Sequence, residues 1–175
     1  MSIPSRLTRY LRQQDARYDS DLHRPSRSSA ETARQAHVSP HQLAKSVILE
    51  DDTGHMLMAV LPADAQVELP ALAELLGRRS LRLCEEAQVA RLFGDCCPGA
   101  VPALGMAWGV ETAVDDALVD GNAVIYMEAG DHERLLRMSR EQFSALMRPA
   151  RHGHFSRRHH TGPAAASPAV AAPAS

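Results

Sequence analysis

The sequence predicts an α+β fold, in which a mixed β-sheet or barrel of short strands is surrounded by helices. The β-forming segments are short, several are joined by hairpin turns, and helical patterns stand between groups of strands. A doubly wound parallel sheet would instead alternate strands and helices regularly. With 175 residues and a hydrophobic content of 45%, the chain is long enough to bury one core. We therefore expect one domain over residues 1–149, followed by a tail over residues 150–175.

The first half of the chain predicts two helices, a strand and a hairpin. Leu7 and Leu11, four residues apart, indicate an amphipathic helix from Pro4 to Gln14. Ser28 and Glu31 match a capping box that opens a helix reaching about residue 36. The strands expected in this half lie at residues 18–23, 44–50 and 55–61, the last two joined by a turn at residues 51–54.

The second half predicts three further helices and a series of short strands. Residues 69–76 and 85–93 have helical patterns that are followed by Gly77 and Gly94, and glycine is favoured just beyond a helix C-terminus. Ser139 predicts the cap of a last helix that reaches about Met147. The expected strands lie at residues 81–83, 104–108, 110–114, 117–119, 123–128 and 135–138.

The C-terminal segment differs from the body in charge and composition. Residues 1–147 contain 15 basic and 21 acidic residues, a formal charge of −6, whereas the last 28 residues carry four arginines and no acid. After Thr161 the chain contains only Ala, Pro, Ser, Gly and Val, which cannot form a packed core. We expect a disordered tail, whose basic part either contacts phosphates of a nucleic acid or only increases solubility.

Several classes of function are not indicated by the sequence. No apolar run reaches the length of about 18 residues that spans a membrane, and the N-terminus lacks a signal-peptide pattern, so we expect a cytoplasmic protein. The cysteines at positions 84, 96 and 97 lack metal-ligand spacing, and no zinc site or other metal site is expected. No nucleotide or dinucleotide fingerprint is present, so no cofactor is expected. DNA is not an expected partner.

Lys45 is the only lysine of the chain, against 18 arginines, and it stands inside the apolar run of residues 43–49. A lysine offers a flexible point charge with three donors, and burial can change its protonation, which arginine does not allow. Lys45 is therefore a candidate catalytic residue. The alternative is a lysine that extends its ammonium to solvent from a strand end.

The loop of residues 94–105 is the second candidate, because it has three glycines and two prolines in twelve residues. Such a backbone can direct N–H groups at a carbonyl oxygen or a phosphate. Its central part, Gly99, Ala100, Val101 and Pro102, is the expected substrate-binding portion. The alternative is a plain connection between a helix and a strand.

Four further residues are weaker candidates for substrate binding. His23 follows the first strand, and Gly130 and His132 belong to a segment between two predicted strands. Each of these can equally be a structural turn or strand-end residue. Asp115 could orient Lys45 or stand in a hairpin turn.

Taken in order, these features resemble the YbaK/ProXp group of aminoacyl-tRNA deacylases, which has the fold of the editing domain associated with prolyl-tRNA synthetase. The resemblance covers about residues 16–147. Its most specific parts are a lysine early in the central hairpin and a Gly-x-x-Pro loop about fifty residues later. The residues that carry the resemblance are His23, Lys45, Met58–Pro62, Gly99–Pro102, Asp115 and Ala129–Gly130.

The resemblance implies a metal-independent hydrolase that removes a wrong amino acid from tRNA in trans, with tRNA-Pro carrying a small amino acid as the expected substrate. It places Lys45 at the catalytic position and the Gly99–Pro102 loop beside the aminoacyl group. It also implies aminoacyl-tRNA as partner, and an aminoacyl-tRNA synthetase as a second possible partner. The alternative is a non-catalytic module of the same fold that binds a tRNA end or a synthetase.

Overall fold

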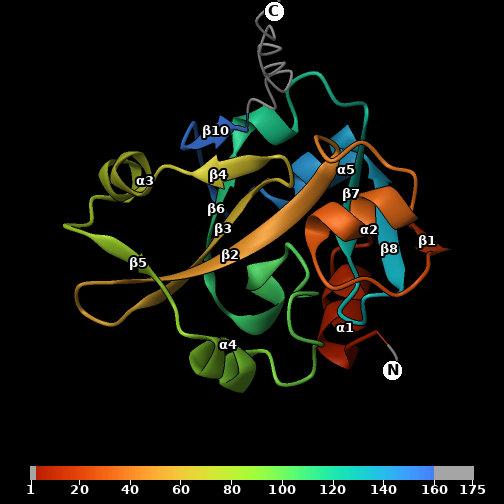
Figure 1. The fold of residues 1–175 in the computed structure, drawn as a ribbon, viewed down its shortest axis with the longest axis horizontal. Helices are drawn as coiled ribbons and strands as arrows, with labels where there is room; N and C mark the ends of the chain where they lie inside the picture. Colours follow the sequence, from red (N-terminus) through yellow and green to blue (C-terminus); the bar gives the residue numbers. More distant parts are fainter. Residues whose placement is uncertain (1–2, 160–175) are drawn as a thin grey trace, which may run out of the picture.

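The computed structural model describes residues 3–159 (Figure 1). Its α-helices are α1 (Ser5–Gln13), α2 (Ser29–Gln35), α3 (Leu69–Leu76), α4 (Glu86–Leu92) and α5 (Arg140–Leu146), and its 3-10 helices are η1 (Gly105–Trp108) and η2 (Asp116–Leu118). Its strands are β1 (Asp19–Leu22), β2 (Leu43–Asp51), β3 (Met56–Pro62), β4 (Ala65–Val67), β5 (Leu81–Leu83), β6 (Glu111–Asp115), β7 (Val124–Glu128), β8 (Arg134–Ser139), β9 (Arg151–Gly153) and β10 (Ser156–Arg158). The expectation of disorder after Thr161 lies outside the described residues.

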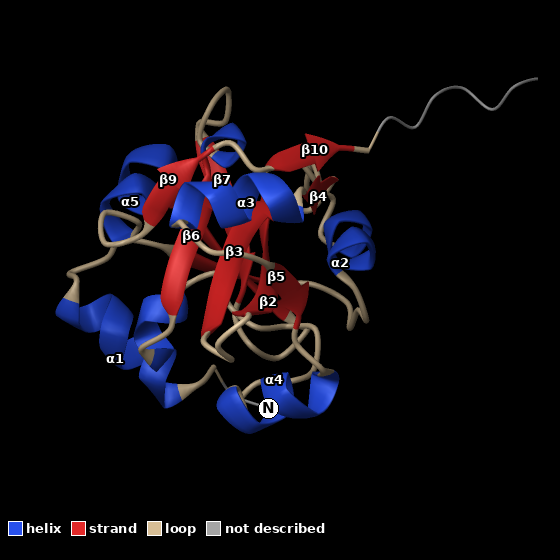
Figure 2. Cartoon of the chain, turned by 90° about the vertical axis from the view of Figure 1, so that its left-hand side faces the viewer, coloured by secondary structure: helices blue, strands red, loops and turns tan. Residues whose placement is uncertain are grey.

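The sheet is mixed, which confirms the predicted α+β class. Its strands follow the order β1-β8-β7-β2-β3-β6-β9, with β5 paired to β2 and a separate pair formed by β10 and β4. The hairpin β2–β3 and the pairs β7–β8, β1–β8 and β2–β5 are antiparallel, whereas β2–β7, β3–β6 and β6–β9 are parallel. The helices lie around this sheet (Figure 2).

Strand β3 lies at the centre of the core. Its residues Leu57–Leu61 have no exposed surface. Met58 and Val60 pack into the cluster that includes residues of α1 and α5, whereas the other three pack into the cluster that includes residues of α3. A strand that is covered on both faces is apolar at every position, and this explains the continuous run in the sequence.

Local capping signals predicted three helix ends correctly. Ser28 accepts a hydrogen bond from the backbone N–H of Glu31 at the start of α2, and Ser139 accepts one from Gln142 at the start of α5. Gly77 ends α3 with a φ of 65°, in the left-handed region that glycine adopts without strain. These helix ends depend on neighbours in the sequence, so a local pattern is enough to locate them.

Two segments that were predicted as strands are 3-10 helices. Residues 104–108 contain η1, whose turns are closed by hydrogen bonds from the N–H groups of Ala107 and Gly109 to the carbonyl oxygens of Leu104 and Met106. Residues 117–119 belong to η2 and its C-cap, because the Asp115 carboxylate accepts a hydrogen bond from the Ala117 N–H and starts a turn. Both segments form a turn of 3-10 helix that is packed into the core, and this burial explains why their residues are apolar.

The domain boundary predicted at residue 149 is too early. Residues 151–153 form β9 beside β6, and residues 156–158 form β10 beside β4, a strand that the sequence did not predict. Phe155 stands between the two strands, is 1% exposed, and joins the core cluster of α3. The fold therefore extends at least to Arg158.

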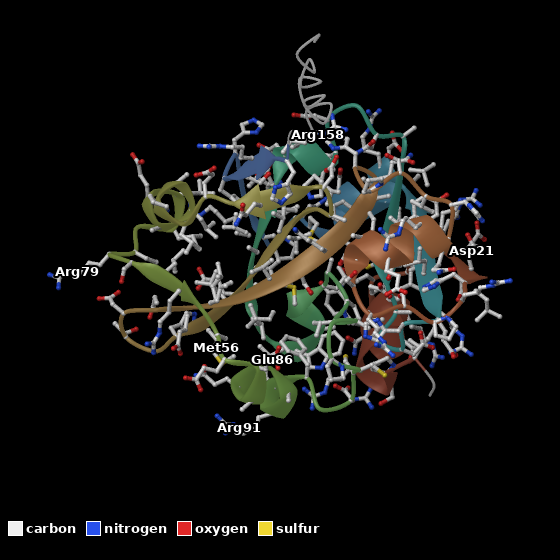
Figure 3. All side chains as sticks on the ribbon, in the orientation of Figure 1. Asp21, Met56, Arg79, Glu86, Arg91 and Arg158 are labelled. Atoms are coloured by element: carbon white, nitrogen blue, oxygen red, sulfur yellow. The ribbon has the colours of Figure 1, made fainter. Side chains whose placement is uncertain are left out.

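Acidic partners explain why a basic segment belongs to the fold. Arg157 pairs with Glu68 at 2.8 Å, and Arg158 pairs with Asp64 at 2.8 Å. Figure 3 shows Arg158 on β10, at the same end of the molecule as the β4–β10 pair. The composition of the segment suggested a solvated tail, because these acidic partners lie about ninety residues earlier in the chain.

Candidate active site

The sheet opens beside Lys45. Strand β2 pairs with β7 only through Leu43 and Ala44, and its pairing with β5 begins at Leu49. Residues 45–48 thus have no strand neighbour on this side within the described part of the chain. Such an opening leaves a strand edge that other groups can approach.

The glycine-rich loop occupies this opening. The hydroxyl of Ser46 donates a hydrogen bond of 2.8 Å to the carbonyl oxygen of Val101, and Ala100, Val101 and Pro102 are buried. The structure therefore brings the predicted lysine strand and the predicted Gly99–Pro102 loop side by side.

Lys45 is partly buried and has a lowered pKa. Burial lowers the pKa of Lys45 because the charged form loses water, and the nearby Asp64 carboxylate acts in the opposite direction. Within residues 3–159 the ammonium forms no hydrogen bond and no ion pair. It is therefore available to a phosphate or hydroxyl oxygen of a ligand.

Asp64 was not predicted as a site residue. Its carboxylate lies 3.3 Å from Nδ1 of His41 and accepts a hydrogen bond from Nε of Arg158. The carboxylate that acts on Lys45 is thus held by the C-terminal strand β10. No local signal distinguishes Asp64 in the sequence, because its role depends on which segments fold beside it.

Two amides of the Gly99–Pro102 segment have no acceptor among the described residues. The N–H of Cys97 donates to the Gly130 carbonyl at 2.8 Å, and the N–H of Ala100 donates to the Cys97 carbonyl at 3.0 Å. The two prolines of the loop have no N–H. Among the described residues, no acceptor binds the N–H groups of Gly99 and Val101. These two amides are the backbone donors that the Gly99–Pro102 segment can offer to a ligand.

His132 lies against the start of the loop. Its Nε2–H donates to the carbonyl oxygen of Pro98, and a Cβ at Gly99 would lie 3.3 Å from its ring carbon Cε1. Gly130, with a φ of 101°, packs against Pro4, whose Cδ would be 2.8 Å from a Cβ. The structure therefore gathers three predicted residues, Gly99, Gly130 and His132, around one turn.

Glu128 stands in the same region, and the sequence analysis missed it. It is 3% exposed at the end of β7, and its Oε1 accepts a 2.6 Å hydrogen bond from the Thr32 hydroxyl of α2. Burial raises the pKa of Glu128, while the nearby imidazoles of His132 and His23 lower it. The only sequence signal was an acid at the end of an apolar strand.

The parallel register relates Glu128 to Lys45. Leu43 and Ala44 of β2 stand opposite Tyr126 and Met127 of β7. The next residues, Lys45 and Glu128, therefore follow on adjacent strands and point to the same face of the sheet. A cation and a buried carboxyl thus flank the point where β2 and β7 separate.

Asp115 has a structural task. Its oxygens accept hydrogen bonds from the N–H groups of Ala117 at 2.8 Å and Phe155 at 2.9 Å. It thereby anchors the C-terminal segment to η2. The carboxylate that acts on Lys45 is Asp64 and not Asp115.

Cys96, in the loop ahead of Gly99, is poorly suited to act as a nucleophile. Burial, followed by the nearby Asp95 carboxylate, raises the pKa of Cys96 to about 12. A thiol with this pKa stays protonated at neutral pH, and the thiolate is the reactive form. Within residues 3–159 no three His, Cys, Asp or Glu side chains are placed to hold a metal ion.

Two cavities of the described residues lie elsewhere. One of about 550 Å³ lies between Arg17 and Arg137, and another of about 370 Å³ lies beside Pro149. Neither includes Lys45 or the Gly99–Pro102 loop. We assign the candidate site by its chemistry, because a free ammonium and unpaired amides can stabilise a developing charge and an open groove cannot.

A sequence model of the aminoacyl-tRNA editing domain matches residues 23–146. The chain belongs to the aminoacyl-tRNA editing domain family. The match confirms the family predicted from the lysine strand and the loop. A comparison of the sequence with curated proteins found no match. In the described part, no helix has both the length and the apolar character needed to cross a membrane.

Solved structures share the fold of this editing-domain protein. The crystal structure of the hypothetical protein APE2540 superposes with a TM-score of 0.77 at 22% identity, covering 87% of this chain and all of the other. The structure of a proposed trans-editing enzyme for prolyl-tRNA synthetase gives a TM-score of 0.75 at 19% identity, covering 89% of this chain and 99% of the other. The likeness extends over nearly the whole length of both neighbours.

Proposed function

We propose that this protein is a trans-editing hydrolase for mischarged aminoacyl-tRNA in the cytoplasm, and that its substrate is tRNA-Pro carrying a small wrong amino acid. The observation that carries the proposal is the Lys45 ammonium, unpaired among the described residues, on a strand whose next residue, Ser46, contacts the Gly99–Pro102 loop in a member of the editing-domain family. The fold neighbour described as a trans-editing enzyme for prolyl-tRNA synthetase supports the choice of tRNA-Pro and of the synthetase as a partner.

In this proposal Lys45 binds the 3′ end of the tRNA. Its ammonium contacts a phosphate or ribose hydroxyl oxygen of the terminal adenosine. Partial burial strengthens this contact, because a charge pair is screened less away from water. Asp64 opposes the effect of burial and so helps Lys45 to remain protonated.

The loop amides stabilise the transition state. Water attacks the ester carbonyl, and the carbonyl oxygen gains negative charge that the N–H groups of Gly99 and Val101 bind. The bond between the carbonyl carbon and the ribose oxygen then breaks. The amine of the substrate, or a ribose hydroxyl that passes on its own proton, relays a proton from the water to the ribose oxygen, which leaves as a hydroxyl. These steps use substrate groups and side chains of this chain, without a metal ion.

The other predicted residues surround the aminoacyl group. Ala100, Val101 and Pro102 belong to the loop that Ser46, the neighbour of Lys45, contacts, and His132 supports this loop at Pro98. The Gly130 carbonyl accepts the N–H of Cys97 ahead of the loop, and His23 acts with His132 on the Glu128 carboxyl. A site lined by a loop backbone and small side chains suits a small amino acid better than a large one.

A deacylation panel tests the proposal. The full chain is incubated with tRNA-Pro charged with Ala, Cys, Ser, Thr or Pro, and the loss of aminoacyl ester is followed. Lys45→Ala serves as the inactive reference. We expect rapid hydrolysis of at least one small mischarged amino acid, with Pro-tRNA spared.

Binding measurements distinguish the alternative. A non-catalytic module of this fold would bind the charged tRNA or the synthetase without shortening the lifetime of the ester. That result with all five amino acids would overturn the hydrolase proposal.

A further inference from the structure

The side chain of Ser46 joins strand β2 to the glycine-rich loop. Its hydroxyl donates a 2.8 Å hydrogen bond to the carbonyl oxygen of Val101, which lies 55 residues later in the chain. Within residues 3–159, no other hydrogen bond connects β2 to residues 99–102. Because Ser46 directly follows Lys45, this bond ties the loop to the strand that carries the proposed catalytic residue.

The backbone of Ser46 does not hold the loop. Alternate residues of an antiparallel strand direct their backbone groups to opposite sides, so Ser46 shares the side of Gln42 and Ile48. The carbonyls of those two residues accept hydrogen bonds from Tyr126 and Cys84. The pairing of β2 with β7 ends before Ser46, and in the described part of the chain neither its N–H nor its carbonyl has a hydrogen-bond partner. The hydroxyl is therefore the polar connection across the opening.

Lys45 and Ser46 leave the strand on opposite faces of the sheet, because successive side chains of a strand alternate. Ala44 and Ile48, which share the face of Ser46, belong to the same core cluster as Val101. The loop thus reaches the opening from the face opposite to the Lys45 side chain, and a substrate that contacts both has to lie across the opening. A substitution at Ser46 can consequently displace the loop without removing the charge of Lys45.

A tight turn holds the other end of this segment. The N–H of Ala100 donates to the Cys97 carbonyl at 3.0 Å, and Gly99 is the third residue of the turn that this bond closes. The φ of 81° at Gly99 is the left-handed value that a type II turn requires at that position. The amide of Val101 follows immediately, and it lies between this turn and the carbonyl that accepts from Ser46.

Apolar packing alone does not orient the peptide groups of the segment. The side chains of Ala100 and Val101 are buried, which fixes where the chain runs, but the hydrophobic effect has no preferred direction. A hydrogen bond does constrain direction. The peptide between Val101 and Pro102 has no N–H, so the carbonyl is its one polar group. Without a donor this carbonyl would turn toward water, and the adjoining amide of Val101 would move with it.

We propose that Ser46 is a positioning residue of the site: its hydroxyl holds the Val101 carbonyl and thereby fixes the orientation of the Val101 amide. This amide is one of the two in the Gly99–Pro102 segment that have no acceptor among the described residues. The bond serves the chemical step and not the affinity for tRNA, because Lys45 stays in place without it. The catalytic consequence rests on the proposed hydrolase function, whereas the anchoring of the loop does not.

Three variants test the catalytic consequence. Ser46→Ala removes the hydroxyl, and Ser46→Thr keeps it. Thr53→Ala is the matched control, because it removes a hydroxyl that donates a 2.7 Å hydrogen bond to Asp51 at the other end of the same hairpin. We expect Ser46→Ala to lower the single-turnover rate by about tenfold or more and to change the tRNA affinity by about twofold or less, because a misplaced donor weakens binding of the transition state only. Ser46→Thr should restore most of the rate, and Thr53→Ala should keep it.

Amide hydrogen exchange tests the anchor without any substrate. The N–H of Ala100, which closes the turn, should exchange about fivefold faster or more in Ser46→Ala, because loss of one hydrogen bond shifts a local opening equilibrium by roughly this factor. In Ser46→Thr the exchange of this amide should stay close to that of the wild type. In Thr53→Ala it should be unchanged, even where amides of the hairpin turn exchange faster.

The outcomes separate this proposal from the proposed function. If Ala100 exchanges at the wild-type rate in Ser46→Ala, or equally fast in Ser46→Ala and Thr53→Ala, Ser46 does not anchor the loop. A loss of tRNA affinity as large as the loss of rate would also contradict the positioning role. If Ser46→Ala does not fold, Ser46→Cys decides instead, because a thiol keeps the shape of the side chain but donates only weakly. If the wild type hydrolyses no mischarged tRNA, the hydrolase proposal fails, while the exchange measurement still decides whether the anchor exists.

Discussion

The residue-scale feature on which the proposed chemistry depends is a partly buried ammonium that forms no ion pair with any residue of the described part of the chain. An exposed lysine binds a phosphate weakly, because water screens the charge, and a lysine already paired with a carboxylate would have to give up its partner. Lys45 avoids both conditions, since burial removes water while Asp64 stays beyond ion-pair distance. The balance keeps a charge available for the substrate.

Lys45→Ala should lower the single-turnover deacylation rate by about 100-fold or more, the effect of losing one preorganised donor to the transition state. Lys45→Arg should lower it by at least about tenfold, because a planar guanidinium cannot reproduce the ammonium geometry. Arg79→Ala is the charge-matched control, since Figure 3 shows Arg79 pointing away from the molecule. Near-normal turnover in either folded Lys45 variant would remove Lys45 from the mechanism.

Gly99→Val should obstruct the site as well as strain the backbone. The φ of 81° at Gly99 disfavours any β-branched residue, and the new side chain would press against the His132 ring. Gly54→Val is the matched control, because Gly54 has a φ of 83° but open space around it. We expect similar losses of melting temperature in both variants and a large loss of deacylation only in Gly99→Val. Equal activity losses would favour the plain-connection alternative for the loop.

Glu128→Gln should change the pH dependence of stability. The folded-state pKa of Glu128 lies above its unfolded value of 4.5, because burial disfavours the charged form. Its contribution to stability is therefore fully present below about pH 4.5 and is lost as pH rises through the folded pKa. The stability of Glu128→Gln relative to the wild type should rise between pH 4 and pH 7. Denaturant unfolding at both pH values measures it, and a constant difference would contradict the raised pKa.

The candidate site was predictable only where one residue is unusual by itself. Lys45 stands out as the single lysine, and Gly99–Pro102 stands out by composition. Asp64 and Glu128 are ordinary acids among 21, and they matter because β10 and α2 fold beside them. Such residues require the strand pairing to be known first.

At the scale of elements, the C-terminal strands are the part of the fold that local patterns could not show. Helices with caps were found because their signals are adjacent in the sequence. By contrast, β9 and β10 are three residues each and pair with strands that precede them by about 40 and 90 residues. A short basic strand whose partners are distant acids looks like a solvated tail when it is examined alone.

Truncation tests the corrected boundary. Removing everything after His159 should leave the melting temperature and the deacylation rate nearly unchanged, because β9, β10 and Phe155 remain. Ending the chain at Pro149 removes the fully buried Phe155 and should cost about 3 kcal/mol or more of stability. It also removes Arg158, a partner of Asp64. The variant Phe155→Ala removes the packing of this side chain but keeps Arg158, so it separates the two losses. If the two truncated chains were equally stable, the domain boundary would return to residue 149.

At the scale of the whole molecule, charge limits how the tRNA can be bound. The chain has a formal net charge of −2, and two of the four C-terminal arginines are paired with Glu68 and Asp64. Proteins that rely on many phosphate contacts need a broad basic surface. In the proposed function, this acidic body suits recognition of the aminoacylated end alone, by Lys45 and the loop.

The salt dependence of binding should therefore be shallow. A protein with six to ten phosphate contacts loses about 10³-fold to 10⁵-fold in affinity between 50 and 200 mM salt, whereas one or two contacts predict a loss of about tenfold or less. We expect the smaller loss for an uncleavable analogue of charged tRNA-Pro, and nearly equal hydrolysis of a minihelix that contains only the acceptor stem. Arg151→Ala, at an exposed arginine of β9, should weaken binding slightly at 50 mM salt and not at 200 mM. A steep salt dependence, or failure to hydrolyse the minihelix, would mean that the body binds the rest of the tRNA through a basic surface which this charge distribution does not suggest.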